Sequence, residues 1–141
     1  MTLVVVFIVA VVASVSLRSS SPGNSTKGAT AECVFTNQPF TVSAPQTRNF
    51  QECLAAGSSH AIEFSLTANS SWTISGTIKS EFPVGVQLLE FGFETEGVLF
   101  SQNDTTSANF SNIHLIPAAL HEVYITNLGR NNSMSISLLF S

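Results

Sequence analysis

The chain has 141 residues, of which 10% are charged and 44% are hydrophobic, and its formal net charge is −4. This charge argues against a nucleic-acid partner, because nucleic-acid binding requires a basic face. Serine and threonine number 21 and 13. A surface solvated by hydroxyl groups rather than by charges is typical of an extracellular protein. The length fits one domain plus an N-terminal tether, residues 1–17.

Residues 1–17 are almost continuously apolar, MTLVVVFIVAVVASVSL, and the run ends at Arg18. As a helix, roughly 15 residues span about 22 Å, whereas a bilayer core usually needs ~20 residues. A secretory signal would carry a basic region before its apolar core, but Met1-Thr2 is uncharged. A retained anchor, a cleaved signal, a filament-core helix and a buried core segment all stay open. The assembly or membrane contacts are assigned to Leu3, Val4, Val5, Val6, Phe7, Ile8, Val9, Val11 and Val12.

Residues 18–31, RSSSPGNSTKGATA, are rich in Ser, Gly, Pro and Thr and lack periodicity, which predicts a flexible linker. The folded domain is therefore expected to cover residues 32–141. Cys33 and Cys53 are the only cysteines. Outside the cell they are expected to form a disulfide worth about 3 kcal/mol. A two-cysteine metal site is the alternative, but no CxxC motif or nearby histidine supports it.

Period-two alternation of apolar and polar residues dominates the folded domain. It is clearest where Ile62, Phe64 and Leu66 alternate with Glu63 and Ser65. Further alternating runs follow at 72–79, 84–88, 110–116, 123–126 and 134–138, and Pro83 and a polar segment at 103–108 separate neighbouring runs. About eight strands at this spacing predict an all-β fold, an antiparallel jelly-roll-like β-sandwich, preceded by the N-terminal apolar helix.

Two resemblances follow from these segments. Ile62–Leu66, Trp72–Gly76, Val86–Leu89 and Ile116–Gly129 follow one another in an order that resembles the jelly-roll modules called pre-peptidase C-terminal domains. That resemblance covers residues 60–141 and implies an accessory, binding or structural part of a secreted protein. The apolar start before a β-rich domain resembles processed type IV pilins, especially archaeal ones. It implies that residues 1–17 pack against copies of themselves in a filament core.

No residue pattern indicates catalysis or a bound cofactor. The three histidines, His60, His114 and His121, do not share metal-ligand spacing, and His121-Glu122 starts an HExxH-like stretch without the second histidine. The chain contains no GxSxG, GxGxxG or GxxxxGK[ST] motif. An acidic cluster is either a calcium site or a solvated loop, and its members are Glu90, Glu94, Glu96 and Asp104.

Five sequons for N-glycosylation follow the tether, at Asn24, Asn69, Asn103, Asn109 and Asn131. We expect Asn69, Asn103 and Asn131 to lie at turns between strands, with their side chains in water. Asn109 is the least certain site, because the adjacent Phe110 should be buried. The alternative is that some of these asparagines are unmodified turn residues.

The sequence therefore predicts a non-catalytic protein of the cell surface or extracellular space, associated with the membrane through residues 1–17. The leading hypothesis is a structural subunit of a pilus-like filament or surface assembly, in which copies of the chain are the partners. The second hypothesis is a membrane-anchored or secreted module that binds a glycan or a protein.

Overall fold

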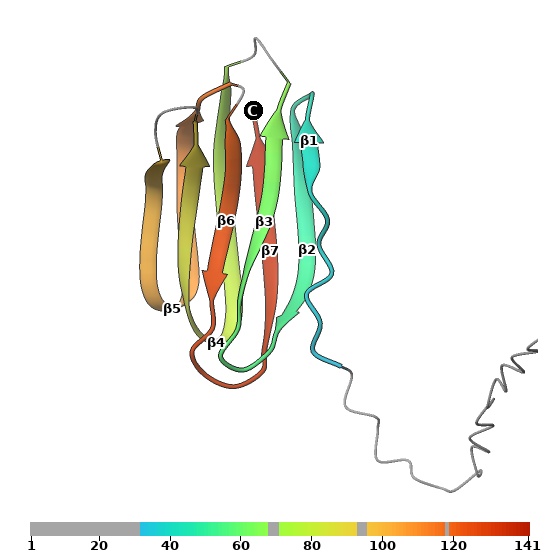
Figure 1. The fold of residues 1–141 in the computed structure, drawn as a ribbon, viewed down its shortest axis with the longest axis vertical. Coiled ribbons are helices and arrows are strands. Elements are labelled where there is room, and N and C mark those ends of the chain that lie inside the picture. The colour runs from blue at the N-terminus through green and yellow to red at the C-terminus, as the bar shows by residue number, and fades with distance from the viewer. Residues whose placement is uncertain (1–31, 68–70, 93–95, 118) are drawn as a thin grey trace, which may run out of the picture. The chain divides into compact units, whose positions relative to one another are not determined.

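The computed structural model describes residues 32–67, 71–92, 96–117 and 119–141. Seven strands are present in these ranges (Figure 1). They are β1 Phe40–Val42, β2 Gln46–Leu54, β3 Ser59–Leu66, β4 Trp72–Phe91, β5 Glu96–Leu115, β6 Leu120–Thr126 and β7 Asn132–Phe140. The predicted all-β class is confirmed, while the predicted helix over 1–17 and linker over 18–31 lie outside the described residues. No helix in the described ranges is long and apolar enough to cross a membrane.

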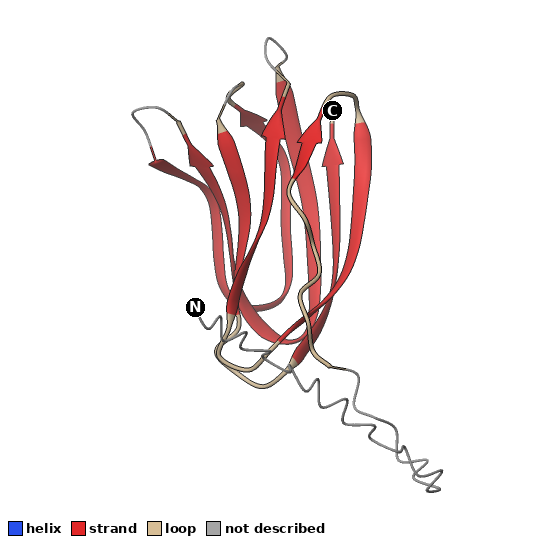
Figure 2. Cartoon of the chain, turned by 45° about the vertical axis from the view of Figure 1, so that its right-hand side comes forward, coloured by secondary structure: helices blue, strands red, loops and turns tan. Residues whose placement is uncertain are grey.

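All seven strands belong to one hydrogen-bonded sheet in the order β1-β3-β6-β4-β7-β2, with β5 paired to β4. The first part of β4 pairs with β7 and the second part pairs with β6. The sheet therefore curls over itself into a nearly closed barrel, in which β4 and β5 run through both walls (Figure 2). The first wall consists of β1, β3, β6 and the second part of β4, and the second wall consists of β2, β7 and the first part of β4. β5 pairs with β4 in both walls.

The alternating pattern places one apolar set of side chains inside the barrel. Successive side chains of a strand point to opposite faces of the sheet, so every second residue contributes to the core. On β7, for example, Met134, Ile136, Leu138 and Phe140 are buried. The same alternation on β3, β4 and β6 completes a single hydrophobic cluster between the two walls.

Two predicted strand breaks, at Pro83 and at residues 103–108, instead lie within β4 and β5. The described residues therefore form seven strands rather than about eight, in one curled sheet rather than two separate ones. Pairing of β4 with β7 ends at Ser80 and pairing with β6 begins at Gly85. Pro83 falls between these two ladders, where its missing N–H interrupts no hydrogen-bond pattern. The sheet is also not purely antiparallel, because β1 pairs with β3 in parallel.

Residues 33–39, called the strap below, link the two ends of the sheet. A disulfide joins Cys33 to Cys53 of β2, as predicted, with a Cα–Cα distance of 5.0 Å. The N–H of Thr36 donates to the buried carboxylate of Glu52 on β2 at 2.8 Å. On the other side, the ring of Phe35 stacks on His60 of β3 with centroids 4.8 Å apart. The strap therefore holds together two strands that do not pair directly.

Two buried asparagines fix the chain near the junction of the walls. Asn132 makes two hydrogen bonds to the backbone of Phe82, accepting from its N–H at 3.0 Å and donating to its carbonyl at 2.8 Å. Asn127 donates to the carbonyl oxygens of Leu54, Ala55 and Arg130. The sequence predicts a turn at Asn131, yet the amides of Asn127 and Asn132 on either side supply hydrogen bonds that the strands do not provide there.

Candidate functional site: a neutral polar sheet face

The outer surface of the second wall carries hydroxyl and amide side chains aligned in rows. Because residues paired across neighbouring strands lie side by side, the strand register sets each row. Two rows cross β2, β7, β4 and β5, and a third crosses β2, β7 and β4. They are Gln51–Ser135–Lys79–Ser107, Asn49–Ser137–Thr77–Asn109 and Thr47–Leu139–Ser75. We call this surface the polar face.

The polar face is almost without charge. Lys79 is the one ionisable side chain in the three rows, and Leu139 is the one apolar side chain, with 46% of its surface exposed. The other members are Ser, Thr, Asn or Gln, each of which offers both a donor and an acceptor. The face can therefore form many hydrogen bonds with a neutral ligand but few ion pairs.

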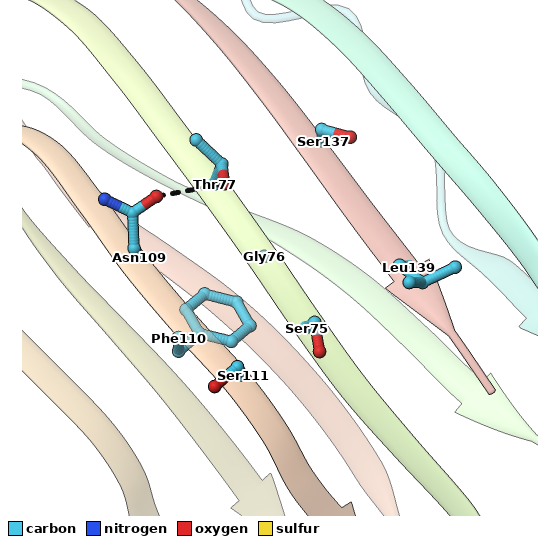
Figure 3. A pocket seen from close by; sticks show the side chains of 8 residues that line it. All are labelled: Ser75, Gly76, Thr77, Asn109, Phe110, Ser111, Ser137 and Leu139. Carbon is cyan, nitrogen blue, oxygen red and sulfur yellow. Dashed lines mark hydrogen bonds between the residues drawn. The ribbon is translucent and has the colours of Figure 1, made fainter.

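Two shallow grooves cross this face and share Thr77 and Ser137. The larger has a volume of about 460 Å³ and is lined by residues of β4, β5 and β7 (Figure 3). The smaller has a volume of about 300 Å³ and extends to Asn49 and Gln51 of β2. Within the larger groove, the hydroxyl of Thr77 donates to Oδ1 of Asn109 at 3.0 Å. Nδ2 of Asn109 donates to the hydroxyl of Ser107 at 3.3 Å. These contacts orient the central amide of the face.

A bulge in β5 shapes one end of the larger groove. The register with β4 shifts between Ile74 and Gly76, and Asn112 in β5 adopts a left-handed backbone with φ of 50°. Its N–H donates to the hydroxyl of Ser75 at 3.0 Å. A Cβ atom at Gly76 would collide with the ring of Phe110, so a glycine at this position lets the aromatic ring cover the strand. Asn is among the few residues that tolerate the left-handed region.

The three sequons in the described ranges are all solvent-exposed at their asparagine. Asn131 lies in the connection between β6 and β7, as expected from turn chemistry, whereas Asn103 lies within β5 rather than in a turn. Asn109 lies in a strand next to Phe110, which is buried as predicted. Asn24 and Asn69 lie outside the described residues. Glycosylation of these five asparagines stays a prediction.

One histidine, His121, forms a buried pair with the acidic residue Glu90. His121 is fully buried, and its Nε2 lies 2.9 Å from Oε2 of Glu90, which also accepts the N–H of Ile116. Burial lowers the pKa of His121, and the hydrogen bond and charge of Glu90 and the backbone of Ala119 offset this only in part. Sequence reasoning missed this pair because only the register of β4 against β6 brings the two residues together.

The acidic cluster predicted from the sequence does not form as such. Glu90 points into the core toward His121, and Glu94 lies outside the described residues. On the outer face of the first wall, Glu63 lies opposite Glu122 in the ladder of β3 and β6. Partial burial raises the pKa of Glu122, and the charges of Glu63 and Glu96 raise it further. Within the described ranges, no three His, Cys, Asp or Glu side chains are placed to hold a metal ion.

No protein-family model matches the chain, and no curated protein matches its sequence. Among solved structures, the chain is similar to Aeromonas hydrophila PliG, a periplasmic lysozyme inhibitor of g-type lysozyme. The sequence identity is 9%, the match covers 75% of this chain and 100% of that chain, and the TM-score is 0.41. No functional conclusion for this chain follows from so distant a likeness.

Proposed function

We propose that this chain is a non-catalytic extracellular module that binds a neutral oligosaccharide on the polar face. The observation that carries this proposal is the alignment of hydroxyl and amide side chains across four neighbouring strands with a single charge among them. Sugar hydroxyls both donate and accept hydrogen bonds, as do the side chains of Ser, Thr, Asn and Gln. An ionic ligand would find only Lys79 as a counter-charge in these rows.

The composition of the polar face favours a glycan over a protein partner. Protein–protein interfaces are enriched in aromatic residues, Met and Arg, and they are depleted in Ser and Lys. The rows contain Ser75, Ser107, Ser135 and Ser137 and no aromatic side chain. This is the opposite of the composition that a stable protein interface requires.

The shallowness of the grooves favours an extended ligand. A single hydrogen bond contributes only about 1 kcal/mol net, because each one replaces a bond to water. Several must therefore form together to give measurable affinity. Four strands at ~4.8 Å spacing present a face on the order of 14 Å wide. The two grooves meet at Thr77 and Ser137, so an oligosaccharide lying across the strands would contact both.

Binding of neutral polysaccharides by the intact chain and by paired variants tests this proposal. Thr77→Val and Ser137→Ala together remove the two hydroxyls that both grooves share, with little change in volume. We expect at least about tenfold weaker binding by calorimetry, equivalent to ~1.4 kcal/mol. Ser101→Ala changes an exposed serine of β5 outside the rows and should leave binding unchanged. The proposal would be contradicted if the intact chain bound no neutral glycan. It would also be contradicted if Ser101→Ala weakened binding as much as the combined Thr77→Val and Ser137→Ala variant.

The predicted filament subunit is a second proposal, and it rests on the apolar sequence of residues 1–17. The disulfide supports an extracellular location, and that location is compatible with either function. The resemblance to pilins and to pre-peptidase modules likewise stays a prediction. Electron microscopy of purified cell-surface material distinguishes the two functions. Dispersed monomers, with residues 1–17 cleaved or embedded in lipid, would contradict the filament.

A further inference from the structure

We infer that Asn103 is the N-glycosylated residue among the sequons of the described ranges, and that its first sugar lies in a groove beside it. This inference rests on the extracellular location given under the proposed function but does not depend on the polar face. The groove has a volume of about 360 Å³ and lies where β4 and β5 pass from one wall to the other. Its lining includes Asn103 itself.

The amide group of Asn103 is the least constrained of the three: Asn109 is held through both amide atoms, and Asn131 is held through Oδ1 alone, with no hydrogen-bond partner for its Nδ2 among the described residues. Oδ1 of Asn109 accepts from Thr77 and its Nδ2 donates to Ser107. Oδ1 of Asn131 accepts the N–H of Ala56 at 3.0 Å. Among the described residues, the side chain of Asn103 has no hydrogen-bond partner, and it is exposed. Its Nδ2 can therefore be modified without loss of a stabilising contact.

The backbone directs Asn103 toward the groove. The next residue, Asp104, has a φ of 52°, in the left-handed region, so β5 changes direction there. Across the ladder, a Cβ atom at Gly85 would lie 3.1 Å from Oδ1 of Asn103. A glycine at this position thus makes room for the asparagine side chain. The consequence is that Asn103 leans over β4 rather than away from the protein.

The groove has the mixed chemistry that contacts a sugar ring. Leu128 is 87% exposed, and it lines the groove together with the exposed Pro83. These apolar groups fit the C–H face of a sugar. Gln87 and Thr126 line the same groove and offer donors and acceptors to its hydroxyls. The attached sugar would cover apolar surface that otherwise faces water.

The modification requires a donor that the secretory pathway supplies, an oligosaccharide linked through pyrophosphate to a polyprenol. Nδ2 of Asn103 forms a bond to C1 of the first sugar, and the bond between C1 and the pyrophosphate oxygen breaks. The amide nitrogen loses one proton, and the polyprenyl pyrophosphate leaves. Thr105 supplies the hydroxyl that completes the sequon.

Glycopeptide mapping of the full chain secreted from a eukaryotic cell tests the site. We expect an N-linked glycan at Asn103, lost in Asn103→Gln and kept in Thr105→Ser, which retains the sequon. Asn109→Gln and Asn131→Gln should leave the glycan mass at Asn103 unchanged. An unmodified Asn103 in the secreted chain, or occupancy of Asn109 or Asn131 with or without Asn103, would overturn the inference.

Thermal unfolding tests the position of the sugar. The glycan is trimmed to one N-acetylglucosamine and compared with the fully deglycosylated chain. We expect a higher Tm for the trimmed form, and this difference should disappear in Leu128→Ser. Leu139→Ser, which alters an exposed leucine on the polar face, should keep it. A glycan that leaves Tm unchanged, or a difference that persists in Leu128→Ser, would overturn the docking. If the polar face bound no oligosaccharide, the glycopeptide map and the Tm difference would be unaffected. The proposed binding function and the proposed glycosylation at Asn103 can therefore fail independently.

Discussion

At the scale of single residues, the buried imidazole of His121 makes the stability of the fold depend on pH. It stacks on Phe64 with ring centroids 5.2 Å apart and shares a hydrogen bond with Glu90. Because burial disfavours the charged imidazole, the pKa of His121 in the folded protein lies below 6.5. In the unfolded chain, His121 takes up a proton near pH 6.5. In the folded protein, its imidazole stays neutral at that pH. Lowering the pH from 6.5 toward the folded pKa therefore favours unfolding.

We expect the urea midpoint of the intact chain to fall as the pH is lowered through this window. In His121→Gln, this part of the pH dependence should disappear, because glutamine can donate to Glu90 but does not titrate. Glu122 acts in the opposite direction, since a raised pKa stabilises the folded state as its carboxylate takes up a proton. For that reason the difference between the intact chain and the variant is the quantity to measure. A difference that is constant between pH 7.5 and 5 would contradict the assignment to His121.

At the scale of elements, β4 is the strand that connects the two walls, and Asn132 of β7 holds it at the crossing. Its amide replaces the ladder hydrogen bonds that are absent around Phe82. In Asn132→Ala, the partly buried N–H of Phe82 loses its partner, and its carbonyl keeps only the hydroxyl of Ser80. We expect a loss of about 1–3 kcal/mol in the free energy of unfolding, measured by urea titration. Asn131→Ala removes one exposed hydrogen bond, to Ala56, and should cost less. Equal losses would show that the Asn132 amide does not hold the crossing.

The individual strands could be predicted from the sequence, and their connections could not. Alternation along β3 and β7 is a local signal, and Ile62, Phe64 and Ile136, which are apolar members of those alternating runs, lie in the core. The continuity of β4 through Pro83 depends on which strands pair on either side, and no local pattern encodes that. The polar face has the same origin, because it exists only once β2, β7, β4 and β5 lie in register. Turn chemistry near Asn103 suggested a break where β5 only bends.

At the scale of the whole molecule, the strap closes the sheet, and the disulfide fastens the strap. Phe40, just after the strap, lies 6.1 Å from Phe50 of β2 and 5.8 Å from Phe64 of β3 between ring centroids. Core packing thus reinforces the covalent link. Together they connect the edge strands β2 and β1, which no hydrogen-bonded ladder joins.

We expect Cys33→Ser combined with Cys53→Ser to lower the free energy of unfolding by about 3 kcal/mol, since the cross-link restricts the unfolded chain. Urea titration of the intact chain with and without reductant measures the same quantity. Reductant should leave the double variant unchanged, which is the internal control. If reduction does not shift the midpoint of the intact chain, the cross-link contributes nothing to stability.

The disulfide also determines how the domain bears tension. A pull on the chain upstream of Glu32 reaches Cys33 and passes through sulfur directly to Cys53, bypassing the residues between them. The bypassed segment contains the strap, β1 and most of β2, and fully extended it would add roughly 65 Å of slack. This extra length cannot be released while the disulfide between Cys33 and Cys53 is intact. The load arrives instead near the end of β2, beside β7, so a force applied at Glu32 is delivered to the wall that carries the polar face.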